Sequence, residues 1–205
     1  MTSTFTFIMV STLTLIMAST SIMASALSFS SLPELEDCLL HFHIDSNLWN
    51  GVKPSNLLAD IQKGESVLEI EEDQLYRRVN VVSVYCYFTN DNNEKMRLVE
   101  EKQIMPDGKM RLRGYTFVSE TMKKGESPQQ AARRGLAEEL QISDPELQFE
   151  VLNDEKITKE STTFVGINTH YLIHYLKTEI PLRHFKEHYV EMENGVETHF
   201  KWERV

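Results

Sequence analysis

The pattern of hydrophobic and polar positions predicts strands on both sides of one well-marked helix. Residues 79–88 are rich in β-branched and aromatic side chains, which is typical of a buried strand. Residues 96–104 and 109–117 indicate two further strands, joined by a Pro-Asp-Gly hairpin turn at residues 106–108. Three more strands are predicted after the helix, over residues 147–152, 163–176 and 200–205.

The helix between these strands has clear start and stop signals. Ser127 is a good N-cap, Pro128 occupies the first helical position, and Gln130 stands three residues after the cap. An Asp-Pro pair at residues 144–145 closes the segment. Four-residue spacing gives the helix one apolar face, formed by Ala132, Leu136 and Leu140. The order of strands, helix and strands predicts an α/β domain.

The first part of the chain differs from the rest. Residues 1–31 contain 14 Ser or Thr, and the first charged side chain is Glu34. An apolar run over residues 5–17 and a small-x-small site at residues 24–26 indicate a cleavable targeting leader. It resembles a secretory signal peptide without the basic start, or a plastid transit peptide without the usual arginine. A transmembrane anchor is the weakest reading because the segment is rich in hydroxyl groups.

The remaining chain is predicted to form two parts. Residues 32–75 are an N-terminal extension with a short helix that ends at Gly64, and residues 76–205 are the main domain. The formal net charge is −10 at pH 7, and such an acidic surface repels nucleic-acid backbones and anionic lipid. We therefore expect neither a nucleic-acid partner nor a stable membrane anchor. Two cysteines, with no CxxC spacing, support neither a disulfide framework nor a zinc finger.

Carboxylates, one arginine and apolar residues stand at fixed spacing through the predicted helix and the loop before it. These residues are Glu126, Arg134, Leu136, Glu138, Glu139 and Ile142. Their spacing resembles the box of the Nudix hydrolase superfamily, which reads Gly, five residues, Glu, seven residues, Arg-Glu-apolar-x-Glu-Glu-x-Gly-apolar. The chain departs from this box at Glu120, Gly135 and Gln141, which replace glycine, glutamate and glycine.

The resemblance implies a Nudix-like α/β/α sandwich with a mixed β-sheet and a loop-helix-loop catalytic segment. It also implies magnesium- or manganese-dependent hydrolysis of a small organic or nucleoside diphosphate, in which the metal neutralises the diphosphate and activates water. By position in the box, Glu126, Glu138 and Glu139 are the expected metal ligands. Arg134, Glu138 and Glu139 are the expected catalytic residues, with Arg134 tying the loop to the helix through a box carboxylate.

Gly135 leaves the activity open, because this position in the family often supplies a metal ligand and sometimes the general base. The chain is then either a hydrolase with reduced activity or a catalytically inactive Nudix-fold binding or regulatory protein. A third alternative is that the missing side chain makes room in the site for an unusual ligand. A hydrolase would recruit a carboxylate from elsewhere, with Asp154, Glu155, Glu160 and Glu193 as candidates. Because glycine inside a helix costs about 1 kcal/mol relative to alanine, Gly135→Ala is expected to stabilise the domain if the site tolerates a methyl group.

Three cations alternate along the predicted strand before the box. Lys109, Arg111 and Arg113 would share one face of that strand. Arginine grips phosphate oxygens with two parallel hydrogen bonds, so this face is a candidate phosphate-binding surface for a small-molecule diphosphate. The alternative is the ordinary charged, solvent-exposed face of an antiparallel sheet.

Overall fold

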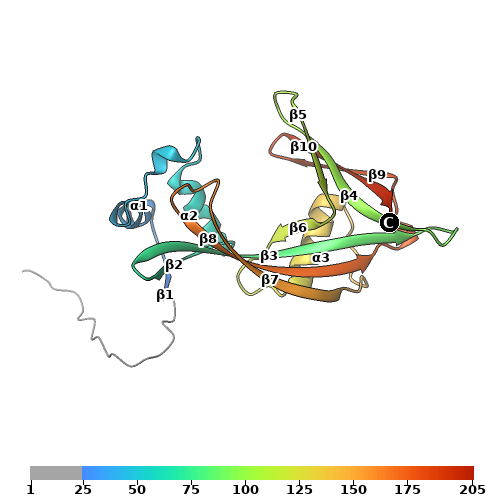
Figure 1. Ribbon diagram of the computed structural model, residues 1–205, viewed down its shortest axis with the longest axis horizontal. Coiled ribbons are helices and arrows are strands. Elements are labelled where there is room, and N and C mark those ends of the chain that lie inside the picture. The colour runs from blue at the N-terminus through green and yellow to red at the C-terminus, as the bar shows by residue number, and fades with distance from the viewer. Residues whose placement is uncertain (1–24) are drawn as a thin grey trace, which may run out of the picture.

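Two long strands run through the computed structural model, which describes residues 25–205. β3 (Gln74–Thr89) and β8 (Asn168–Glu179) pair in parallel along the whole of β8. β3 is longer than the predicted 79–88 strand, and its 16 residues span roughly 50 Å at about 3.3 Å per residue. The two strands therefore connect packed regions at both ends of the molecule (Figure 1).

The main domain surrounds one end of these strands. Its other strands are β4 (Lys95–Ile104), β5 (Met110–Tyr115), β6 (Val118–Thr121), β7 (Glu150–Glu160), β9 (His188–Glu193) and β10 (Val196–Arg204). β4 and β6 pair with β3, β7 pairs with β8, and the order continues from β4 to β10 and β9, with β5 on β4. All these pairs are antiparallel, so the sheet is mixed, as predicted.

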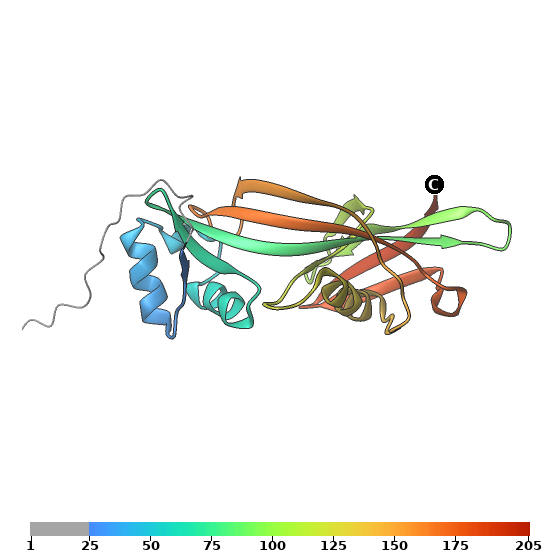
Figure 2. The same ribbon diagram turned by 90° about the horizontal axis from the view of Figure 1, so that it is seen from below.

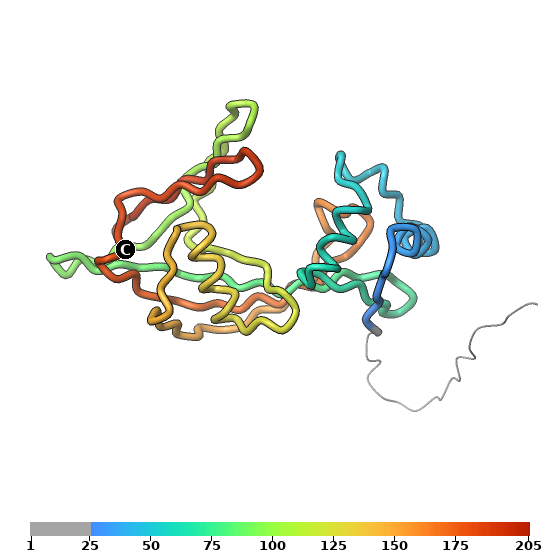
Figure 3. The backbone as a smooth tube through the Cα atoms, turned by 180° about the vertical axis from the view of Figure 1, so that it is seen from behind, coloured from blue at the N-terminus to red at the C-terminus, as the bar shows by residue number. Residues whose placement is uncertain are grey.

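Helix α3 (Pro128–Leu140) lies between the long strands and the β9–β10 hairpin (Figure 3). The predicted start is confirmed: the Ser127 hydroxyl accepts from the Gln130 N–H at 3.2 Å, and the Gln130 side chain accepts from the Ser127 N–H at 2.8 Å. Its apolar face packs into the main core with strand residues such as Val82 and Leu176. The α/β class and the loop-helix segment are thus confirmed.

The N-terminal extension packs against the other end of the long strands (Figure 2). It contains β1 (Ser25–Leu27), α1 (Leu32–His41), a 3-10 turn (Ser46–Leu48), α2 (Pro54–Lys63) and β2 (Val67–Glu71). The predicted short helix is α2, which ends at Gly64 with φ +77°. Trp49 is fully buried and donates its indole N–H to the Val165 carbonyl at 2.9 Å. Because Phe164 and Ile167 also enter this cluster, the extension shares its core with the turn between β7 and β8.

Several boundaries differ from the prediction. β3 runs without interruption through the expected boundary between residues 75 and 76. The predicted strand over 109–117 corresponds to β5 alone, which ends at Tyr115, just after Gly114 with φ +71°. β6 begins at Val118, beyond the predicted range. The predicted strand over 147–152 begins only at Glu150 and continues to Glu160, and Leu147 lies in the core before it.

Most of the predicted leader lies outside the described residues. Its last residues include β1, which pairs with β2. A short connecting turn, Leu182–His184, precedes β9. Within residues 25–205, no helix is both long and apolar enough to span a membrane.

Candidate functional site

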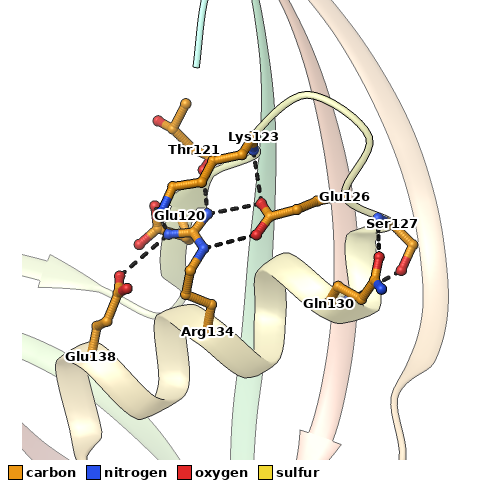
Figure 4. A network of polar contacts seen from close by, with 8 residues as sticks. All are labelled: Glu120, Thr121, Lys123, Glu126, Ser127, Gln130, Arg134 and Glu138. Carbon is orange, nitrogen blue, oxygen red and sulfur yellow. Dashed lines mark hydrogen bonds and ion pairs between the residues drawn. The ribbon is translucent and has the colours of Figure 1, made fainter. Parts of the chain in front are cut away.

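Arg134 joins the loop before α3 to the helix itself. Its Nε and Nη2 donate to the two Glu126 carboxylate oxygens at 2.9 and 3.0 Å (Figure 4). Its Nη2 also donates to the Thr121 carbonyl at 2.8 Å, and its Nη1 lies 2.9 Å from Glu120 and 3.3 Å from Glu138. The loop-to-helix tie expected from the box is therefore present, with Glu126 as the partner. The hydrogen bonds from Arg134 lower the Glu126 pKa, although burial opposes them.

A cleft of about 840 Å³ opens beside this arginine, and carboxylates from four elements and one loop line it. They are Glu138 and Glu139 on α3, Glu120 on β6, Glu100 on β4, Glu191 and Glu193 on β9, and Glu65 just after α2. Arg113, Lys123 and Lys63 are the other lining cations besides Arg134. Because Arg113 pairs with Glu100 at 2.9 Å and Arg134 with three other glutamates, negative charge exceeds positive charge around the cleft.

Glu139 is the carboxylate of this cleft whose pKa is shifted most. It is half-buried and has no ion pair or side-chain hydrogen bond within residues 25–205. Burial, reinforced by the charges of Glu191, Glu120, Glu100 and Glu193, raises the pKa of Glu139 to about 9. Burial likewise raises the Glu191 pKa, with Glu193 adding to the effect. A proton or a cation in the cleft would relieve this repulsion.

Gly135 faces the strand that carries Glu120. A Cβ atom on Gly135 would lie 2.9 Å from the Cβ of Glu120 and 3.3 Å from its Cγ. Both distances are shorter than ordinary van der Waals contact, and the Cβ of Glu120 cannot turn away by side-chain rotation. The site therefore does not tolerate the methyl group of an alanine at residue 135. The stabilisation expected from Gly135→Ala depended on that tolerance, so it is not expected in this structure.

The carboxylates suit a hard divalent cation, although their present side-chain positions are not those of a formed site. Magnesium prefers oxygen ligands, and Glu138 and Glu139 place theirs in the cleft, as predicted from the box. Within residues 25–205, no three His, Cys, Asp or Glu side chains already converge as metal ligands. Glu126 is fully engaged by Arg134 and by the Lys123 N–H at 2.7 Å, and it lines a neighbouring hollow rather than this cleft.

The three cations proposed to bind phosphate are not held together. Arg113 lines the cleft, where Glu100 accepts its hydrogen bond. Lys109 precedes β5, is 82% exposed at its side chain and pairs with Asp107 at 2.6 Å. Arg111 is exposed and does not line the cleft. Only Arg113 is therefore placed to meet a ligand there.

The candidate replacement carboxylates also separate. Glu193 lines the cleft, whereas Asp154 pairs with His174 at 2.8 Å on the β7–β8 pair. Glu155 accepts from the Tyr175 hydroxyl, and Glu160 lies at the far end of β7, so neither lines the cleft.

The sequence reasoning missed four carboxylates of the cleft, which are Glu65, Glu100, Glu120 and Glu191. A signal existed for Glu120 alone. It replaces a box glycine in the same chain in which Gly135 replaces a box glutamate.

A comparison with protein-family models identifies a family for this chain. The model of the NUDIX domain matches residues 79–197. No curated protein matches the chain. A C. elegans Ap4A hydrolase structure is 17% identical, covers 62% of this chain and 80% of its own, and has a TM-score of 0.35. The E. coli dihydroneopterin triphosphate pyrophosphohydrolase is 18% identical over 60% of this chain and 78% of its own, with a TM-score of 0.41.

A third structure, the NUDIX domain of Shewanella oneidensis NrtR in complex with ADP ribose, is 12% identical. It covers 75% of this chain and 84% of its own, with a TM-score of 0.43. The family model carries the assignment, because it spans more than half of the 205 residues and includes the whole carboxylate-bearing loop and helix. This chain belongs to the Nudix family.

Proposed function

We propose that this chain is a divalent-metal-dependent hydrolase of a small organic or nucleoside diphosphate. The observation that carries the proposal is the position of Glu138 and Glu139, which match the family box and face a cleft with surplus negative charge. Such a cleft repels an anionic diphosphate unless a cation is bound first. Magnesium or manganese is the expected cofactor, since all the surplus ligands are carboxylate oxygens.

The chain's own residues divide the work in the proposed reaction. When bound, the metal supplies charge neutralisation for the diphosphate and acidity for water. Arg134 holds Glu120 and Glu138 at the wall of the cleft, and Arg113 presents a guanidinium to phosphate oxygens. Glu139 holds a proton at neutral pH without a cation, and it must release this proton to become a ligand.

Aromatic side chains offer a surface for the organic part of the substrate. Phe117 and Tyr175 both line the cleft, with ring centroids 5.3 Å apart in an edge-to-face arrangement. Tyr115 also lines the cleft and is 52% exposed. A flat group such as a nucleobase would gain stacking area there.

A second function is favoured by Gly135, which removes a carboxylate that the family box normally places on the helix. In that case the chain is a catalytically inactive Nudix-fold protein that binds a nucleotide or another partner for regulation. The two functions share a fold and a cleft, and they differ in turnover.

Phosphate release from a panel of small diphosphates, with and without magnesium or manganese, tests the proposal. The metal should also raise the melting temperature, because it binds only the folded state. Replacing both Glu138 and Glu139 with Gln should remove both effects. The matched control is Glu71→Gln with Glu72→Gln, an adjacent pair outside the cleft. Ligand binding without turnover at any metal concentration would favour the regulatory function, and a metal shift that survives the double substitution would place the ions elsewhere.

A further inference from the structure

The two departures from the Nudix box at residues 120 and 135 are reciprocal. Where the box has glycine, the chain has Glu120, and where the box has the first helical glutamate, the chain has Gly135. Glu120 lies on β6 and Gly135 on α3, and these two elements pack against each other. The exchange therefore takes place across one contact and not between distant parts of the chain.

The Glu120 side chain occupies the space into which a side chain at residue 135 would extend. Its Cβ and Cγ lie 2.9 and 3.3 Å from the position of a Cβ on Gly135, and its Oε2 lies 3.7 Å from it. Only one of the two positions can carry a long side chain at this spacing. The carboxylate of Glu120 thus lies within van der Waals contact of the position that a Cβ atom at residue 135 would occupy.

Glu120 also stands among the carboxylates of the cleft. Its Oε1 and the Oε2 of Glu138 contact the same Arg134 nitrogen, at 2.9 and 3.3 Å. Glu120 and Glu139 also line the same cleft. Figure 4 shows Glu120 and Glu138 reaching the Arg134 guanidinium from β6 and from α3. Glu120 therefore shares an arginine nitrogen with Glu138 and a cleft with Glu139.

Arg134 does not need Glu120 as a structural partner. Glu126 already binds its Nε and Nη2, and the Thr121 carbonyl accepts a further hydrogen bond. Glu120 is mostly buried, with 20% of its side chain exposed, so its charge has a desolvation cost that one shared arginine nitrogen offsets only in part. A second role for this carboxylate accounts for its presence there.

We propose that Glu120 supplies from β6 the carboxylate that the helix lacks at Gly135, so that Glu120, Glu138 and Glu139 together bind the divalent cation. The inference rests on the proposed function, because it names a ligand for the same cleft. It also replaces Glu126 in the expected ligand set, since Glu126 is engaged by Arg134 outside the cleft. Glu120 is then a catalytic residue that the family pattern does not contain.

The test measures Mn²⁺ affinity by calorimetry and by the electron paramagnetic resonance signal of free Mn²⁺, with diphosphate hydrolysis recorded separately. Glu120→Gln keeps the size of the side chain and should weaken Mn²⁺ binding by at least about tenfold. The reciprocal variant, Glu120→Gly with Gly135→Glu, moves the carboxylate back to the helix and should recover most of that loss. Glu69→Gln is the matched control, because Glu69 is also a buried carboxylate paired with an arginine, at 2.8 Å, but lies on β2 outside the cleft.

Wild-type Mn²⁺ affinity in Glu120→Gln would overturn the inference and leave Glu120 as a partner of Arg134 only. Failure of a folded reciprocal variant to regain affinity would overturn it as well, and if that variant does not fold, Glu120→Gln decides alone. Hydrolysis that survives in Glu120→Gln supports the proposed function and refutes the inference. Glu120-dependent Mn²⁺ binding without hydrolysis supports the inference and refutes the proposed function, whereas absence of Mn²⁺ binding in the wild type refutes both.

Discussion

Gly135→Ala should destabilise the domain, although alanine is the better helix former. The helix itself would gain about 1 kcal/mol from the substitution. The new Cβ, however, would lie 2.9 Å from the Cβ of Glu120, an atom fixed to the backbone of β6. Relief requires α3 and β6 to move apart, and the buried residues Leu136 and Val118 flank the contact on the two elements. Overpacking of this kind costs about 1–3 kcal/mol, so the net loss should be about 0–2 kcal/mol.

Urea denaturation of four proteins measures the free-energy cost of the contact between residues 120 and 135. The four are the wild type, Gly135→Ala, Glu120→Gly and the double variant. The change in helix propensity is the same in the wild-type and Glu120→Gly backgrounds and therefore cancels from the comparison. In the Glu120→Gly background the clash is absent, so Gly135→Ala should stabilise the domain by several tenths to about 1 kcal/mol. The coupling free energy between the two positions should then be about 1–3 kcal/mol.

Two results would refute this reasoning. Stabilisation of the wild-type background by Gly135→Ala, by about the full helix-propensity gain of 1 kcal/mol, would show that the helix and strand are not in tight contact. A coupling free energy near zero would show that any loss comes from another neighbour. Either result would also remove the steric basis for the reciprocal exchange of residues 120 and 135.

Three further predictions concern the same segment, and one concerns the leader. The pKa of Glu139 is raised from 4.5 to about 9, so between these pH values the folded state keeps a proton that the unfolded chain has lost. Without divalent cations, the free energy of unfolding should therefore fall as pH rises from 4.5 to about 9. Glu139→Gln should flatten this fall in denaturation curves recorded in EDTA. Arg134→Lys cannot reproduce the two-nitrogen contact with Glu126 and should cost about 1–3 kcal/mol by the same assay; an unchanged midpoint would contradict the loop-to-helix tie. Ser127→Ala should cost about 1 kcal/mol through the lost N-cap, and no loss would indicate that the cap is not formed in solution. If the secretory reading of the leader holds, N-terminal sequencing should find the mature protein starting after about Ala26, whereas a start at Met1 would contradict both the signal and the transit hypotheses.

Short-range signals predicted α3 and its start well. The N-cap at Ser127, the proline after it and the apolar spacing of α3 act within a few residues, so the helix and its start follow from local chemistry. The hairpin turn between β4 and β5 is predictable for the same reason, because its Pro-Asp-Gly residues specify the turn directly. The matching box positions also pointed to the family that the family model assigns, because these residues lie within one loop and helix and their spacing can be read along the chain.

Long-range packing decided which side chains line the cleft and how the N-terminal extension joins the main domain. The alternation of Lys109, Arg111 and Arg113 predicted that the three side chains share one face of a strand. Whether a side chain on that face reaches a ligand depends on which other elements form the cleft, and of these three residues only Arg113 lines it. The extension shares a core with the β7–β8 turn through Trp49 and Phe164, which no local pattern indicates. Likewise, Glu120 and Gly135 each look like a lost box residue when taken singly. Their compensation becomes visible only when β6 is packed on α3, because whether a side chain fits depends on atoms contributed by another part of the chain.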